Sequence, residues 1–140
     1  MPGHFRIPSC NREPELALSR QVLVPDVAGW RRERMPQRPT TAQFHVRPDW
    51  VCEVVSPGTA RKDRMLKLPI YAEHGVRWPW LVDPLTQTLE AFELEGTRWV
   101  LLGSWVGDAP ARVPPFDAVE LAMARWWDDG AVAAEAAPAR

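Results

Sequence analysis

The feature that most constrains the fold is a short apolar run that contains a single acid. Residues 50–55 read WVCEVV, and the turn formers Ser56, Pro57 and Gly58 end the run. Apolar side chains on both faces are typical of a strand buried in the centre of a sheet. Glu53 is the exception, because an ionised carboxylate there loses hydration worth several kcal/mol unless a cation compensates it. The run therefore predicts a central strand that carries an unusual acid.

The rest of the chain predicts several more strands around this one. They share apolar or alternating patterns bounded by turn residues, and are expected at 15–18, 22–30 (interrupted by Pro25), 78–82, 88–94 and 98–105, the last two as a hairpin. Asp83 and Pro84 are expected to open a turn.

Two helices are expected from apolar residues at helical spacing. The first runs from about Ala60 to His74 after Thr59 as N-cap, ends at Gly75, and is kinked or split by Pro69. The second runs over residues 115–127. The order of the elements predicts an α/β (α+β) domain with a mixed central sheet flanked by helices.

Length and composition limit the class of protein. The chain has 140 residues and a net charge of −1, which fits one domain and excludes a strongly basic protein that coats nucleic acid. We expect an irregular segment at 1–12, the domain at 13–128 and a flexible tail at 129–140. Cys10 and Cys52 have no metal-binding or disulfide spacing, and no apolar stretch reaches the ~20 residues of a membrane span. A cytoplasmic protein without membrane contact is expected.

Two acids on neighbouring predicted strands suggest a metal site. Asp26 shares a strand face with Val22 and Val24, and Glu53 shares one with Val51 and Val55. Two buried carboxylates repel each other, and a divalent cation between them removes that repulsion. Mg²⁺ prefers such oxygen ligands, and Mn²⁺ could replace it. The alternative is that each acid pairs with an arginine or lies in solvent.

The first helix adds three polar residues at regular spacing. Asp63, Lys67 and Tyr71 follow at i, i+4 and i+8 and therefore lie roughly on one face. A lysine there could orient a metal-bound water or stabilise a phosphate electrostatically. The alternative is a surface Asp–Lys pair worth ~0.3–0.5 kcal/mol.

The segments PDVAGW, WVCEVVSPGTARKDRMLKLPIYAEHGV and WLVDP resemble, in this order, the Uma-two family of restriction endonucleases. The resemblance covers residues 13–127 and implies a restriction-endonuclease-like fold with the PD…(D/E)xK nuclease signature. It implies that Asp26 and Glu53 bind the metal, that Lys67 replaces the lysine whose usual place is taken by Val55, and that Asp63 and Tyr71 support the site. Asp83 is implied to be structural.

The resemblance implies a Mg²⁺-dependent endonuclease that acts on DNA, for which a homodimer would suit cleavage of both strands. Arg31, Arg32 and Arg34 follow Asp26 closely and could contact DNA phosphates, although most such runs are simply solvated. Family members usually start with a further helical and strand region that includes a glutamate near the site, and no counterpart of that region is expected before Glu13. The alternative is an inactive, N-terminally shortened protein that binds a partner or dimerises. A weaker third reading is a single-strand binder that stacks bases on tryptophans, although most tryptophans in strands belong to the core.

Overall fold

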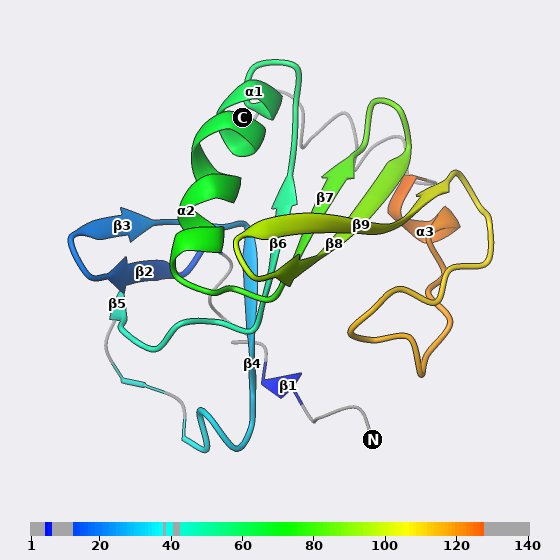
Figure 1. Ribbon diagram of the computed structural model, residues 1–140. Helices are drawn as coiled ribbons and strands as arrows, with labels where there is room; N and C mark the ends of the chain where they lie inside the picture. Colours follow the sequence, from blue (N-terminus) through cyan, green and yellow to red (C-terminus); the bar gives the residue numbers. More distant parts are fainter. Residues whose placement is uncertain (1–4, 7–12, 38, 41–42, 128–140) are drawn as a thin grey trace.

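A mixed six-stranded sheet forms the centre of the computed structural model, which describes residues 5–6, 13–37, 39–40 and 43–127 (Figure 1). Its strands stand in the order β1-β4-β6-β7-β8-β9. Their bounds are β1 Phe5–Arg6, β4 Val27–Arg31, β6 Trp50–Val54, β7 Trp78–Asp83, β8 Thr88–Glu95 and β9 Arg98–Val106. β6 runs parallel to β7, and the other neighbours are antiparallel. The mixed α+β class is therefore confirmed, and WVCEV is an inner strand as expected.

A continuous helical segment connects the parallel strands β6 and β7. It consists of α1 (Ala60–Lys62), the π-helical turn η1 (Asp63–Lys67) and α2 (Leu68–Glu73). Pro69 is the second residue of α2 and cannot donate an N–H to the π-helical turn before it, yet the segment continues through it. The helix is therefore not split, and the expected irregularity is the π-helical turn directly before this proline. Of the helices that the structure describes, none has the length and apolarity needed to cross a bilayer.

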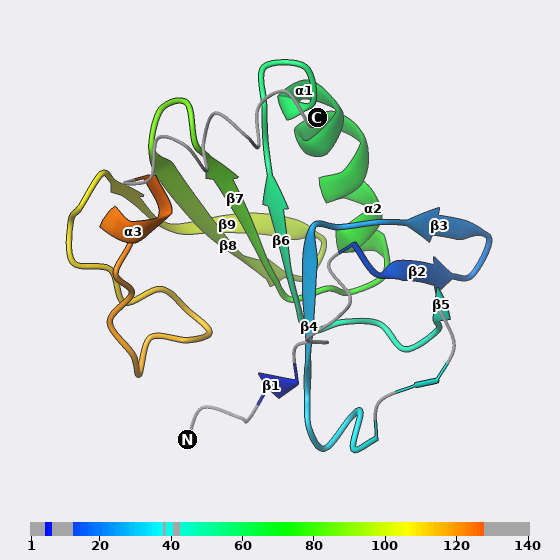
Figure 2. The same cartoon turned by 180° about the vertical axis from the view of Figure 1, so that it is seen from behind.

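A smaller sheet lies beside α2, at the side of the large sheet away from α3 (Ala124–Trp127) (Figure 2). It has the order β3-β2-β5, with bounds β2 Glu15–Leu18, β3 Gln21–Leu23 and β5 Gln43–Phe44. The prediction of one interrupted strand over 22–30 is therefore wrong. Pro25 cannot donate to a ladder, and the chain leaves one sheet before it and enters the other at Val27. Val22 and Val24 are consequently exposed, at 57% and 39%.

Two hydrophobic cores cover the two faces of the large sheet. One packs the small sheet and α2 against the sheet, with Trp30, Phe44 and Tyr71 among its largest buried side chains. The other contains Trp50, Trp78 and Trp80 and is covered by residues 111–127. The four strand tryptophans are 7% exposed or less, so the expectation that they belong to the core is confirmed. Cys52 is buried as expected.

The predicted helix over residues 115–127 is wrong except for its last turn, α3. The chain folds back instead, and the Leu121 N–H donates to the Ala111 carbonyl at 2.7 Å. Pro114 and Pro115 have no N–H to give to a helix. Phe116, Leu121 and Met123 fill the second core from an irregular segment, so their helical spacing reflects burial alone.

The remaining turns agree with the sequence. The Asp83 side chain accepts the N–H of Leu85 at 3.0 Å, which is the expected structural role. Residues 5–6 form β1 within a segment for which the sequence indicates no element. The expected tail at 129–140 lies outside the described residues.

The glycine that follows the C-cap of α2 allows a test of the backbone conformation there. Gly75 has a φ of +78°, and a Cβ there would meet the Arg47 side chain at 3.0 Å. We expect Gly75→Ala to lower the free energy of unfolding by at least about 1 kcal/mol, because alanine is strained in this conformation. Urea denaturation measures the change.

Gly58→Ala is the matched control, since nothing lies within 4 Å of the position that a Cβ would take there. It should change stability much less than Gly75→Ala. If both substitutions lowered the free energy of unfolding equally, the claim that the positive φ of Gly75 strains alanine would be contradicted.

Candidate active site

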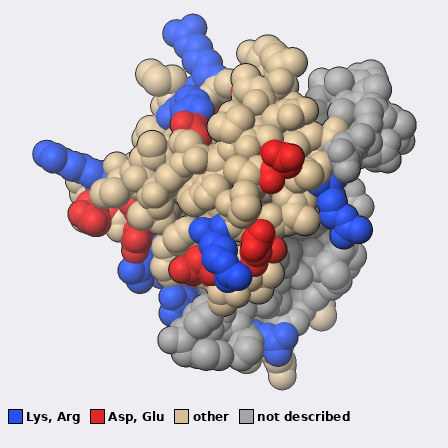
Figure 3. Space-filling view, turned by 90° about the vertical axis from the view of Figure 1, so that its right-hand side faces the viewer, with Lys and Arg blue, Asp and Glu red and all other residues tan. Residues whose placement is uncertain are grey.

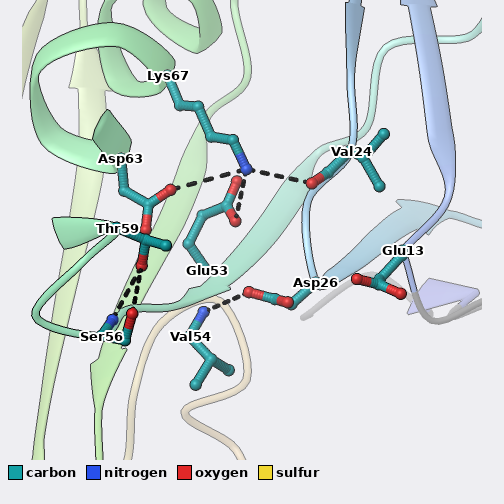
Figure 4. A pocket seen from close by; sticks show the side chains of 9 residues that line it. All are labelled: Glu13, Val24, Asp26, Glu53, Val54, Ser56, Thr59, Asp63 and Lys67. Carbon is teal, nitrogen blue, oxygen red and sulfur yellow. Dashed lines mark hydrogen bonds and ion pairs between the residues drawn. The ribbon is translucent and has the colours of Figure 1, made fainter. Parts of the chain in front are cut away.

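A cavity of about 180 Å³ opens between the end of β6, the helix that follows it and the link between the two sheets. Figure 4 shows the side chains around it. Its lining residues come from four segments of the chain: Glu13, Val24, Asp26, Glu53, Val54, Ser56, Thr59, Asp63 and Lys67. Acids from distant parts of the sequence point toward the same space, so the cavity gathers carboxylates that lie far apart along the chain.

Glu53 is the most buried of these acids, at 2% exposure. It stands on β6 between Val51 and Val55, both of which are buried on the same face, as its strand position predicts. The Tyr71 hydroxyl donates to Oε2 at 2.6 Å, and the Lys67 ammonium lies 3.2 Å from Oε1. One donor on each carboxylate oxygen replaces part of the lost hydration.

Lys67 reaches into the cavity from the π-helical turn. Its Nζ donates to Glu53 and to the Val24 carbonyl at 3.1 Å, and lies 3.7 Å from Asp63 Oδ1. Asp63 is 4% exposed, so this is not the surface Asp–Lys pair that the sequence left open. Lys67 and Tyr71 therefore both contact Glu53, and Asp63 contacts Lys67. The three side chains lie on one face of the helix, as their spacing predicts.

Asp26 comes to the cavity from the point where the chain changes sheets. Its Oδ2 accepts the N–H of Val54 at 2.7 Å, which ties the start of β4 to the end of β6. Because Glu53 immediately precedes Val54, this hydrogen bond holds the two acids at one cavity. Asp26 and Glu53 are therefore brought together as expected, although Asp26 does not share a strand with Val22 and Val24.

The acids and the burial raise several pKa values. The pKa of Glu53 is raised from 4.5 to about 7. Burial is the main cause, the hydrogen bond from Tyr71 and the charge of Lys67 oppose the rise, and Asp63 and Asp26 add to it. Burial also raises the pKa of Asp63, against the stabilising effect of Lys67. The pKa of Tyr71 is raised by burial and by Glu53, so its hydroxyl keeps its proton and remains a donor. Near neutral pH Glu53 is thus divided between its neutral and ionised forms.

The arginines that follow Asp26 in the sequence do not line the cavity. Arg31 ends β4, so five residue steps of extended chain, roughly 16 Å, separate it from Asp26, the acid before the strand. Arg34 is bound to Asp49 at 2.8 Å, and Arg31 lies over the Trp78 ring. Arg32 is exposed. Proximity in sequence failed here because an extended strand carries the chain away.

Sequence reasoning missed Glu13 as a cavity residue. Its backbone N–H donates to the Asp26 carbonyl at 2.9 Å, and Figure 4 shows its carboxylate turned toward that of Asp26. Its φ of +63° is uncommon for a residue other than glycine. The hydroxyls of Ser56 and Thr59 also line the cavity, where the sequence indicated only a turn and an N-cap. No periodic pattern in the sequence could have signalled these positions.

The lining residues fit a hard divalent cation. They offer carboxylate and hydroxyl oxygens, and none of the described residues around the cavity is a cysteine or histidine. Across the described part of the chain, no three acidic, histidine or cysteine side chains already form a metal-binding group. Mg²⁺ is commonly held by one or two carboxylates together with waters. Asp26 and Glu53 would therefore provide enough protein ligands.

The raised pKa of Glu53 makes stability depend on pH. Between pH 4.5 and about 7 the folded chain holds a proton on Glu53 that the unfolded chain has released, so rising pH favours unfolding. Relative to Glu53→Gln, the wild type should lose up to about 3 kcal/mol over this window when divalent cations are chelated. Parallel urea titrations of both proteins at pH 5 and pH 8 measure the difference. A constant offset between the two proteins would contradict it.

Comparisons with known proteins identify the family of the chain and a solved structure with a similar fold. The profile of the Uma2 (Uma-two) family, described as "Putative restriction endonuclease", matches residues 5–124. Among solved structures, the chain is similar to the crystal structure of "a putative nuclease belonging to DUF820" from Anabaena variabilis, with a TM-score of 0.65 and 22% identity over 89% of this chain and 68% of that one. At that identity the likeness shows a shared fold. A search of curated proteins found no match. Because the family profile spans most of its length, the chain belongs to the Uma2 family.

Proposed function

We propose that this protein is a Mg²⁺-dependent endonuclease that hydrolyses phosphodiester bonds in DNA. The observation that carries the proposal is that Asp26 and Glu53 line one cavity together with Lys67. The ammonium group of Lys67 lies between Glu53 of β6 and Asp63 of the helix. Membership of a family described as restriction endonucleases supports the nuclease class and DNA as the substrate. Mn²⁺ would be an alternative cation.

Asp26 and Glu53 would hold the cation. When bound, it would supply an activated water and neutralise the charge that develops on the phosphate. Tyr71 keeps Glu53 Oε2 occupied through a 2.6 Å hydrogen bond, so Oε1 is the oxygen that faces Lys67 and the cavity. The protein thereby fixes the orientation of this ligand before any cation arrives.

Lys67 would contribute positive charge to the reacting phosphate. Its ammonium is held by Glu53, Asp63 and a backbone carbonyl, and its side chain is only 17% exposed. A cation that takes up the Glu53 carboxylate leaves Asp63 and the carbonyl to position the lysine. Positive charge fixed in a partly dry cavity stabilises an anionic transition state more strongly than it would in water.

DNA contacts outside the cavity are proposed for two sets of basic side chains. Arg61 and Lys62 are exposed and directly precede Asp63 on the helix that borders the cavity. The Arg31, Arg32 and Arg34 segment lies at the other end of β4 and could meet phosphates farther along a duplex. With a net charge of −1, the chain depends on such local groups.

A plasmid-nicking assay with Mg²⁺ or Mn²⁺ tests the proposal. The wild type is expected to nick DNA, and Glu53→Gln to reduce the rate at least about a hundredfold because it removes a charged metal ligand. Glu120→Gln is the matched control: Glu120 is exposed and does not line the cavity, so this variant should keep full activity.

Lys67→Met should also lose most of the activity, since its role is electrostatic. Equal nicking by the wild type and Glu53→Gln would refute the assignment of the site. No cleavage of any DNA by a folded, metal-saturated wild type would instead favour the inactive binding protein.

A further inference from the structure

The last strand of the large sheet, β9, has an open edge. It stands at the end of the strand order and pairs with β8 alone among the described residues. Open edges of long strands are usually protected by charged side chains or proline, because their free N–H and C=O groups can pair with another chain. Residues 99–107 of β9 and its continuation read WVLLGSWVG, without a charge or a proline. This edge therefore lacks the usual sequence protection.

Apolar side chains are exposed along the same strand. Val100, Leu101 and Val106 are 36%, 52% and 59% exposed. β9 ends at the side of the molecule shown in Figure 3, where a largely uncharged area lies above a cluster of Lys, Arg, Asp and Glu side chains near the middle of the view. An uncharged strand with exposed aliphatic side chains is suited to contact with another protein surface.

Opposite charges stand at the two ends of this uncharged stretch. Arg98 opens β9 and Asp108 follows it, each five positions from Gly103, and both are exposed. Neither forms an ion pair within the described part of the chain. In an antiparallel pair of two identical strands, the first residue of one copy lies beside the last residue of the other. The stretch is therefore complementary in charge to a second copy of itself.

We propose that β9 pairs antiparallel with β9 of a second copy of this chain, about a two-fold axis near the middle of the strand. The pairing would join two six-stranded sheets edge to edge and bring Arg98 of each copy near Asp108 of the other. With Arg98 opposite Asp108 the axis would pass at Gly103, next to Leu102, which is the extra residue between the partners of Ala91 and Phe92.

The proposal does not depend on nuclease activity, because it uses none of the cavity residues. The proposed dimer would nevertheless matter for cleavage of DNA. A symmetric dimer carries two copies of the cavity related by a two-fold axis, which is the symmetry of the two backbones of a DNA duplex.

Sedimentation equilibrium over a concentration series tests the pairing. The wild type should show a reversible monomer–dimer equilibrium. Leu101→Lys should weaken self-association at least about tenfold, because it places a charge at the shared edge twice. Leu66→Lys is the matched control, since Leu66 is 58% exposed but lies on the helix, and it should leave the dissociation constant unchanged. A wild type that is monomeric throughout, or a dimer that Leu101→Lys does not weaken, overturns the proposal.

A charge exchange tests the ends of the interface separately and does not place a charge on an apolar position. Arg98→Asp and Asp108→Arg alone should each weaken the dimer, because each sets like charges beside each other across the axis. The double variant should recover most of the lost affinity. Single variants that weaken association with no recovery in the double variant would show that these residues do not face each other, and would overturn the antiparallel pairing.

Discussion

The carboxylate of Glu53 lies on an inner strand of the large sheet with 2% of its surface exposed, and much of the surrounding structure serves to compensate it. Burial of a carboxylate costs several kcal/mol unless donors and a positive charge replace its hydration. Tyr71 and Lys67 supply one donor and one charge from the helix that follows the strand. Even with these partners its pKa rises to about 7, so the compensation is incomplete in the protein alone. A divalent cation would complete it, and this is the physical reason for the cation in the proposed function.

The position of Asp26 explains why the cavity lies where it does. The chain leaves the small sheet after β3, passes Pro25 and enters the large sheet at β4. At this change of sheet Asp26 is free to turn toward β6, where it accepts the Val54 N–H, while the Val24 carbonyl accepts Lys67. The same few residues thus join two sheets and one helix. We infer that cation binding here would also strengthen the connection between these elements.

The sequence predicted the centre of the molecule better than its periphery. WVCEVV and its acid indicated the inner strand, and the i, i+4, i+8 spacing indicated the helix face, because burial on both faces and helical geometry are local properties. The resemblance to the Uma-two family predicted Lys67 in place of a lysine at Val55. Lys67 lies 3.2 Å from Glu53, and its role stays a prediction. The helix over 115–127 was wrong because irregular chains can also bury apolar residues at helical spacing. The position of Glu13 at the cavity depends on how distant segments cross, which no local pattern records. Arg31 was misplaced because β4 is extended and carries it away from Asp26.

The most direct test of the central claim is calorimetry of Mg²⁺ binding at pH 6.5 in buffers that differ in ionisation enthalpy. If the cation binds the carboxylate of Glu53, whose pKa is about 7, binding should release about three-quarters of a proton, because the metal-bound form must be ionised. The release should vanish in Glu53→Gln, and binding should be lost or strongly weakened in Asp26→Asn. Binding of Mg²⁺ without proton release, or with a release that Glu53→Gln leaves unchanged, would contradict the account.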